Sequence, residues 1–167
     1  MIEAVLVHPQ KEYKERARHK VANQAIQRLV DSREMSIVKI DTRLDMNGTG
    51  LRTPAEVESL IARMDVVITT RLHGTVFALK NGVPAVVIDP IAGGAKVHRH
   101  AETIGWPLVF TADSLKDEDL QKAYDYCLTA EAREKARECC ARAVKKIEAV
   151  RDQFVAEFMH DRQKAEQ

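Results

Sequence analysis

The residues best suited to chemistry form one short stretch, Thr70-Arg71-Leu72-His73-Gly74. An arginine offers a planar fork of N–H donors that can bind a carboxylate or a phosphate through two parallel hydrogen bonds. A histidine can gain or lose a proton near neutral pH. The stretch therefore predicts recognition of an anionic ligand, with a proton-transfer group beside it. The other interpretation is structural: Arg71 and His73 cap a helix and pair with local acids.

Two predicted elements must position this stretch. Residues 66–68 are β-branched, which is typical of a strand buried on both faces of a parallel sheet. An apolar-periodic helix follows and ends at Asn81-Gly82, a common helix stop. A strand that turns directly into a helix places the helix N–H groups and the positive end of its dipole at the carboxyl edge of the sheet. That edge favours an anion.

Strand and helix patterns alternate along the rest of the chain. Strands are predicted at 3–8, 36–40, 66–68, 84–88 and 108–110, and the helices between and after them include 13–32, 53–63, 114–128 and 130–160. This alternation predicts an α/β fold, a Rossmann-like three-layer domain with a five-stranded parallel sheet and a long C-terminal helix. The domain would span residues 1–128, with residues 129–167 forming a helix that packs on it and frays after Asp161.

Two of the helix starts carry capping signals, and the last helix carries an apolar stripe. Thr53-Pro54-Ala55-Glu56 combines an N-cap threonine, a proline at N1 and a glutamate at N3. Ser114 is predicted to cap the next-to-last helix, with Asp117 at N3. The apolar residues of the last helix alternate at spacings of three and four. Such a stripe fits a coiled-coil seam or a helix lying across a domain, and we favour the second.

Ligands of such sheets bind outside the carboxyl ends of the strands, near the point where the strand order reverses. The candidates at that edge are His8 and Lys11, Asp41 and Arg43, residues 69–74, residues 89–96, and residues 111–113. Gly93, Gly94 and Lys96 also suggest a phosphate-binding loop at a helix N-terminus, although they fall short of a P-loop sequence. His98 and His100 face different sides of a helix, so no metal site is expected.

Composition narrows the class of protein. The chain has 167 residues, enough for one domain with a full core, and Lys+Arg 26 against Asp+Glu 25 argues against a nucleic-acid binder. The longest apolar runs are too short for a membrane span, which predicts that the chain is not an integral membrane protein. The three cysteines suit reduced thiols in a cytoplasmic protein.

Arg71-Leu72-His73-Gly74, the apolar helix, Gly82-Val83-Pro84, a further strand and a loop with Lys96 together resemble the C-terminal half of the polysaccharide pyruvyl transferase family. The resemblance covers roughly residues 36–110. It implies a GT-B-like architecture of two Rossmann-like domains, only the second of which is matched here. It also implies a transferase of exopolysaccharide biosynthesis that moves pyruvyl from phosphoenolpyruvate onto a sugar as a ketal, without a cofactor or metal.

The resemblance assigns roles to single residues. It makes His73 catalytic and gives substrate binding to Thr70, Arg71, Leu72, Gly74, Gly93, Gly94 and Lys96. It implies phosphoenolpyruvate and a saccharide acceptor as partners, and a separate N-terminal domain or a second copy to complete the acceptor cleft, so that full activity would need that second part. Two alternatives remain: a non-catalytic anion-binding or assembly module, and a nucleotide-sugar glycosyltransferase donor domain, for which Glu102 is the only acid near the expected ribose.

Overall fold

A parallel sheet forms the centre of the molecule. The computed structural model describes residues 2–6, 15–41 and 49–165. The strands are β1 (Ile2–Leu6), β2 (Ser36–Lys39), β3 (Val66–Thr69), β4 (Ala85–Asp89) and β5 (Val109–Thr111), in the spatial order β2-β1-β3-β4-β5. Each neighbouring pair is parallel. The predicted α/β class, with a parallel sheet and a long C-terminal helix, is confirmed.

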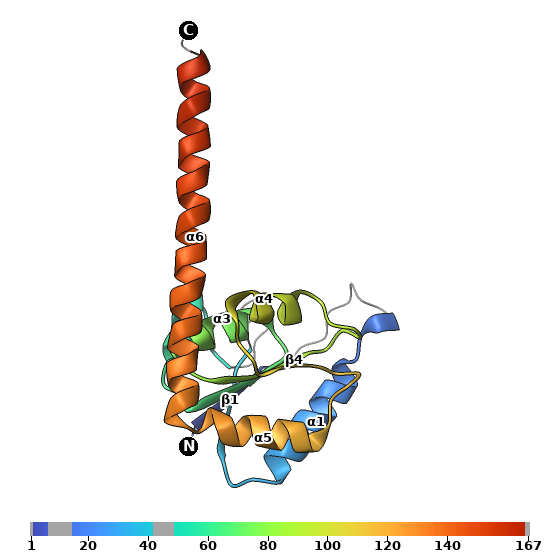
Figure 1. Ribbon diagram of the computed structural model, residues 1–167. Helices are drawn as coiled ribbons and strands as arrows, with labels where there is room; N and C mark the ends of the chain where they lie inside the picture. Colours follow the sequence, from blue (N-terminus) through green and yellow to red (C-terminus); the bar gives the residue numbers. More distant parts are fainter. Residues whose placement is uncertain (1, 7–14, 42–48, 166–167) are drawn as a thin grey trace.

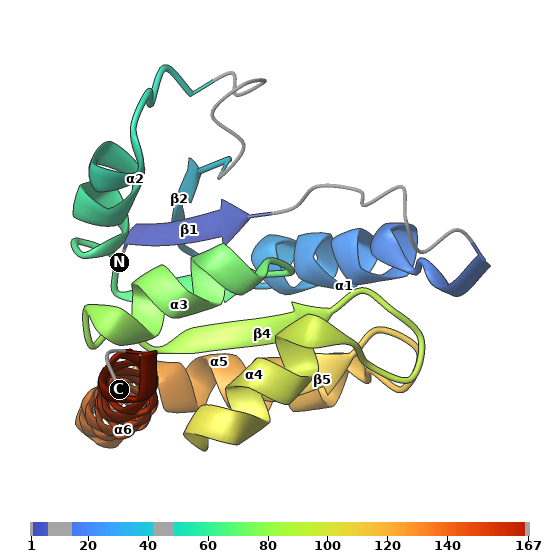
Figure 2. The same cartoon turned by 90° about the horizontal axis from the view of Figure 1, so that it is seen from above.

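Helices cover both faces of the sheet. They are α1 (His19–Asp31), α2 (Pro54–Ile61), α3 (Leu72–Lys80), α4 (Lys96–Ile104), α5 (Asp117–Cys127) and α6 (Ala130–Ala165). Figure 1 shows α3 and α4 on one side of the sheet and α1 and α5 on the other. Seen from above in Figure 2, α3 and α4 lie over the strands. The three layers bury a separate apolar cluster on each face of the sheet.

Alternation along the central strand explains why its residues are apolar without a break. Val66 and Ile68 pack in the cluster beneath α1 and α5, whereas Val67 packs in the cluster beneath α2, α3 and α4. A strand covered on both faces needs apolar side chains at every position. Trp106 belongs to the second cluster, where it is buried and its Nε1–H donates to the Ala85 carbonyl at 2.8 Å. Trp106 is therefore a core residue.

The first helix begins later than predicted. Residues 15–18 precede α1 and run beside the loop after β4, where the Arg18 N–H donates to the Pro90 carbonyl at 2.7 Å. Helix α1 therefore starts at His19 rather than near residue 13. Its buried face includes Ala22, Ala25, Ile26 and Leu29, whereas Val21 is 43% exposed. The candidates His8, Lys11 and Arg43 lie outside the described residues.

One of the two capping predictions is confirmed and the other is wrong. Thr53 Oγ1 accepts from the Glu56 N–H at 3.2 Å, and Glu56 Oε2 accepts from the Thr53 N–H at 3.1 Å, which is a complete capping box. Helix α5 instead starts at Asp117, with Lys116 at the N-cap and no side-chain cap. Ser114 is held elsewhere, since its Oγ lies 2.7 Å from the Thr111 hydroxyl.

Helix α6 has 36 residues, which corresponds to a length of about 54 Å. Ala132, Ala136 and Cys139 are buried where its first turns contact α3, α4 and α5. Beyond them α6 projects away from the rest of the structure (Figure 1). The predicted helix across the domain therefore describes only the first turns. Helix α6 also continues through Ala165, past the predicted fraying at Asp161, and residues 166–167 lie outside the described part.

Candidate functional site

The candidate site lies where the direction of the sheet reverses. Helix α1 carries the chain from β1 outward to β2, whereas α3 carries it from β3 in the opposite direction to β4. Ligands of doubly wound sheets bind beyond the carboxyl ends of the strands at this point. The structure places residues 70–74 there, directly after β3, as the sequence predicts.

The backbone of Arg71 is fixed on both sides. Its N–H donates to the Thr69 hydroxyl at 3.0 Å, and its carbonyl accepts from both the N–H and the hydroxyl of Thr75, each at 3.0 Å. Thr69, Thr70 and Thr75 are buried. Arg71 is the N-cap residue of α3 and has an extended backbone, which lets the chain turn sharply from strand to helix. The threonines thus hold the arginine in place without using its guanidinium.

The Arg71 side chain reaches over the end of the neighbouring strand. Its Nη2 lies 3.9 Å from Oδ1 of Asp41, and the side chain is only 13% exposed. Asp41 follows β2, and β1 lies between β2 and β3. The ion pair therefore crosses the carboxyl end of β1 at the reversal point. The side chain thus places a cationic group with several N–H donors at the edge where ligands of such sheets bind.

The first turn of α3 adds further donors beside Arg71. Among the described residues, none accepts from the N–H groups of Leu72, His73 or Gly74. Such groups at a helix N-terminus carry a partial positive charge that favours an anion. The His73 side chain is exposed. The turn thus combines open backbone donors, a cation and a group that can transfer a proton.

The neighbouring helix N-terminus is filled by the protein itself. Asp89, at the end of β4, is completely buried. Its Oδ1 accepts from the Ile91 N–H at 3.1 Å, and its Oδ2 accepts from the Ala95 and His98 N–H groups at 2.7 and 3.0 Å. An internal carboxylate thus occupies the position at the start of α4 that a bound phosphate would take.

The predicted phosphate-binding loop donates inward as well. Gly93 and Gly94 have positive φ angles of 73° and 74°, which glycine adopts without strain. The Gly93 N–H donates to Asp113 Oδ2 at 3.1 Å, and the Gly94 N–H donates to the Ile91 carbonyl at 2.8 Å. The backbone of both glycines thus faces the protein. A hydrogen bond from the Thr111 hydroxyl, followed by bonds from backbone N–H groups that include that of Gly93, lowers the pKa of Asp113.

Lys96 follows this loop as the first residue of α4 and is partly buried. It sits at the same edge of the sheet as residues 70–74, because β3 and β4 are parallel neighbours. The structure thus brings the start of α3 and the start of α4 to one edge. The two helix starts differ in their N–H groups. Those of residues 72–74 at the start of α3 have no acceptor among the described residues, whereas those at the start of α4 bind Asp89.

The histidines of α4 have local partners. His98 Nδ1 lies 3.4 Å from Glu102 Oε2, and His100 Nδ1 lies 2.7 Å from the Lys96 carbonyl. No group of three or more His, Cys, Asp or Glu side chains within the described residues is arranged to hold a metal ion. Glu102, which a ribose would need, is exposed and lies beside His98.

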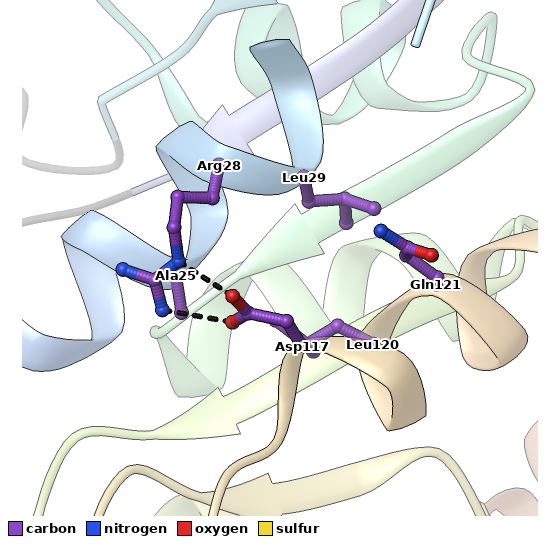
Figure 3. A pocket seen from close by; sticks show the side chains of 6 residues that line it. All are labelled: Ala25, Arg28, Leu29, Asp117, Leu120 and Gln121. Carbon is purple, nitrogen blue, oxygen red and sulfur yellow. Dashed lines mark hydrogen bonds and ion pairs between the residues drawn. The ribbon is translucent and has the colours of Figure 1, made fainter. Parts of the chain in front are cut away.

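A crevice between α1 and α5 is too small to be a substrate site. Figure 3 shows Arg28 and Asp117 joined across it by two hydrogen bonds, of 2.6 and 2.8 Å. Its volume of about 20 Å³ is enough for one water molecule. The bonds from Arg28 lower the pKa of Asp117 and tie the two helices together.

Sequence reasoning missed two residues that shape this edge. Thr75 fixes the Arg71 carbonyl, and Arg16 holds the β4–α4 loop by donating to the Ala92 carbonyl at 2.6 Å. Asp89 was among the candidates, but its position at the start of α4 was not predicted. A threonine four residues after the N-cap was a usable signal, because its hydroxyl can reach the carbonyl of residue i−4. Nothing in the local sequence distinguishes Arg16 from any surface arginine.

The fold is that of a Rossmann-like domain, with Arg71 and His73 at a strand-to-helix turn. Comparison with known proteins gives the family. The model of the polysaccharide pyruvyl transferase family matches residues 7–90, and the chain belongs to that family. No curated protein matches the sequence.

A solved structure shares the fold. The glycotransferase of kitacinnamycin is 15% identical in sequence, with a TM-score of 0.50. The match covers 89% of this chain and 42% of that one, so this chain corresponds to less than half of the neighbour. None of the described helices combines the length and apolar content needed to cross a bilayer.

Proposed function

We propose that the first turn of α3 binds phosphoenolpyruvate for pyruvyl transfer to a sugar, in the cytoplasmic assembly of exopolysaccharide. The observation that carries the proposal is the fixed position of Arg71 at the reversal point, beside the open N–H groups of residues 72–74. Phosphoenolpyruvate has a phosphate and a carboxylate. Arg71 and the helix N–H groups would hold one of them, and the charge of Lys96 would neutralise the other.

His73 would supply the proton that starts the reaction. Protonation of the methylene carbon of phosphoenolpyruvate leaves a cationic centre at the adjacent carbon. One sugar hydroxyl adds there, the C–O bond to phosphate breaks, and a second hydroxyl completes the ketal. The products are the pyruvylated sugar and inorganic phosphate, which takes the net proton released by the two hydroxyls. His73, in the turn that binds the anion, suits the general acid or the base for a hydroxyl.

The cleft that binds the acceptor sugar would need a second side. This chain matches 42% of the length of its structural neighbour, and a separate N-terminal domain or another polypeptide would complete the cleft. Two other functions compete with the proposal. A non-catalytic module would use the same edge for anion binding or assembly alone. A nucleotide-sugar donor domain finds less support, because Glu102 lies against His98.

Calorimetric titration of two ligands separates these functions. Phosphoenolpyruvate and a uridine diphosphate sugar would each be titrated into the wild type, Arg71→Ala and Arg63→Ala. Arg63 is a matched control, because it is an exposed arginine beyond the end of α2. We expect saturable phosphoenolpyruvate binding by the wild type and the control, and its loss in Arg71→Ala.

The other outcomes are equally informative. Binding of only the nucleotide sugar would favour the glycosyltransferase donor domain. Binding of neither would favour the non-catalytic module and count against a donor site in this chain. Phosphoenolpyruvate binding that survives Arg71→Ala would remove the proposed site.

A further inference from the structure

An apolar groove lies on the side of the molecule away from α1 and α5. It has a volume of about 470 Å³ and is formed by α3, α4 and α6, with Val76, Leu79, Ile104, Cys140, Ala143 and Ile147 among its lining residues. Three basic residues, Lys80, His100 and Lys146, also line it, and none of its lining residues is acidic. The groove is therefore apolar inside with basic side chains around it.

An exposed apolar stripe continues from this groove along α6. The residues Cys140, Ala143, Ile147, Val150, Phe154 and Phe158 recur at spacings of three and four, so they share one face of the helix. Ile147, Val150, Phe154 and Phe158 are 69, 68, 66 and 55% exposed. The rings of Phe154 and Phe158 stack with their centroids 6.3 Å apart. Within the described part of the chain, no element lies beside this half of α6 (Figures 1 and 2).

The exposed groove and the exposed stripe together indicate an interaction surface. A helix that projects into water is expected to be polar on every side, and contiguous exposed apolar surface marks an interaction site. The same face of α6 that buries Ala132 and Ala136 against the domain continues, uncovered, to Phe158. The groove and the stripe are thus one continuous surface.

We propose that a second copy of this chain covers both, with the two α6 helices paired antiparallel. When Ile147 of one copy lies beside Val150 of the other, Phe154 comes opposite Ala143 and Phe158 opposite Cys139. Ala143 and Cys139 line the groove. The pairing thus sets the two aromatic side chains of each copy against small residues that line the groove of the other.

Size supports the same occupant. In this register Glu157 comes opposite Cys140, whose S–H donates to the Lys80 carbonyl at 3.6 Å. The pairing is isologous, so each contact occurs twice. In each copy Phe154 and Phe158 are 66 and 55% exposed. With about 150–250 Å² of surface each, the exposed parts of the four phenylalanines would supply about a quarter to a third of the area of about 1,600 Å² that a stable interface buries. A parallel pairing would set Phe154 against Phe154 and leave both grooves unfilled.

Sedimentation velocity of the whole chain tests the dimer. The comparison is between the wild type, the double variant Phe154→Glu/Phe158→Glu, and Lys145→Glu as a control on the opposite face of α6. We expect a wild-type dimer, a control dimer, and a double variant whose dissociation constant rises at least about a hundredfold. Both phenylalanines are exposed in the single chain, so an unchanged circular dichroism spectrum should accompany the loss. A wild type that remains monomeric, or a double variant that still dimerises, would overturn the proposal.

Disulfide trapping tests the antiparallel direction. Glu157→Cys should form an intermolecular disulfide with the native Cys140, which peptide mapping would identify, and Cys140→Ser in the same background should abolish it. A disulfide between two copies of residue 157, or a dimer in which no 140–157 disulfide forms, would overturn the antiparallel pairing.

Discussion

Arg71 reaches the carboxyl edge of the sheet with its peptide group held by two threonines and its guanidinium directed toward Asp41. A long flexible side chain loses entropy when it is ordered on a ligand. In Arg71 part of this entropy is lost on folding, because the fixed backbone and the ion pair restrict the side chain before any ligand binds. Preorganisation of this kind favours affinity.

His73 lies two residues further on, in the first turn of α3, with an exposed side chain. We expect His73→Gln to keep phosphoenolpyruvate binding and to lower turnover by roughly 10²–10⁴-fold, the usual contribution of a general acid or base. The measurement is phosphate release with acceptor present and with whatever second domain completes the cleft. Turnover at the unmodified rate would remove the proton-transfer role.

At the scale of the element, the strand β3 and helix α3 were predictable from sequence, because the signals that form them are local. The β-branched run, the sharp turn and the stop at Asn81-Gly82 all lie within twenty residues, and Gly82 does adopt the positive φ of such a stop, at 67°. One failed prediction depends on a contact between distant residues and the other does not. The start of α1 depends on a bond from Arg18 to Pro90, whereas Ser114 bonds to Thr111, a near neighbour in sequence, rather than capping α5.

In the candidate site, too, some features follow from the local sequence and others depend on the folded chain. Arg71 and His73 are neighbours in sequence, so their shared turn could be predicted. The Asp41 contact joins the ends of two strands that are not adjacent in the sheet. The groove is formed by three helices, and only the folded chain brings these together.

The capping box at Thr53 gives a test of local helix stability. Thr53→Ala removes the acceptor for the Glu56 N–H and should lower the free energy of unfolding by about 1 kcal/mol. Urea denaturation measures the change. Ser59→Ala, at an exposed position inside α2, is the control and should shift the midpoint little. Equal effects of the two substitutions would show that the cap does not contribute.

At the scale of the whole molecule, ion pairs join helices that are distant in sequence. Arg28 of α1 binds Asp117 of α5, and Lys80 of α3 binds Glu58 of α2. The hydrogen bond from Arg28 lowers the pKa of Asp117, and the hydrogen bond from Lys80, followed by that from Asn81, lowers the pKa of Glu58. These pairs are exposed enough that salt should weaken them.

A lowered pKa fixes the sign of the pH dependence. A carboxylate with a lower pKa in the folded state stabilises the fold above its unfolded-state pKa, and this contribution is lost as pH falls through the folded-state pKa. We therefore expect stability to fall in acid below the ordinary pKa range of Asp and Glu, and Asp117→Asn to make that fall shallower. Urea midpoints measured against pH check this. An unchanged slope in Asp117→Asn would show that its pair is too well solvated to matter.

Asp89 gives the edge of the sheet a selectivity that its two helix starts would otherwise lack. Its carboxylate is an internal ligand, bound by the Ile91 N–H in the loop after β4 and by the Ala95 and His98 N–H groups at the start of α4. A free anion would have to displace a competitor whose effective concentration is set by the chain, and such intramolecular competitors act at about millimolar levels or above. Dilute phosphates and carboxylates should therefore bind poorly at that helix start, which leaves the first turn of α3 as the proposed site.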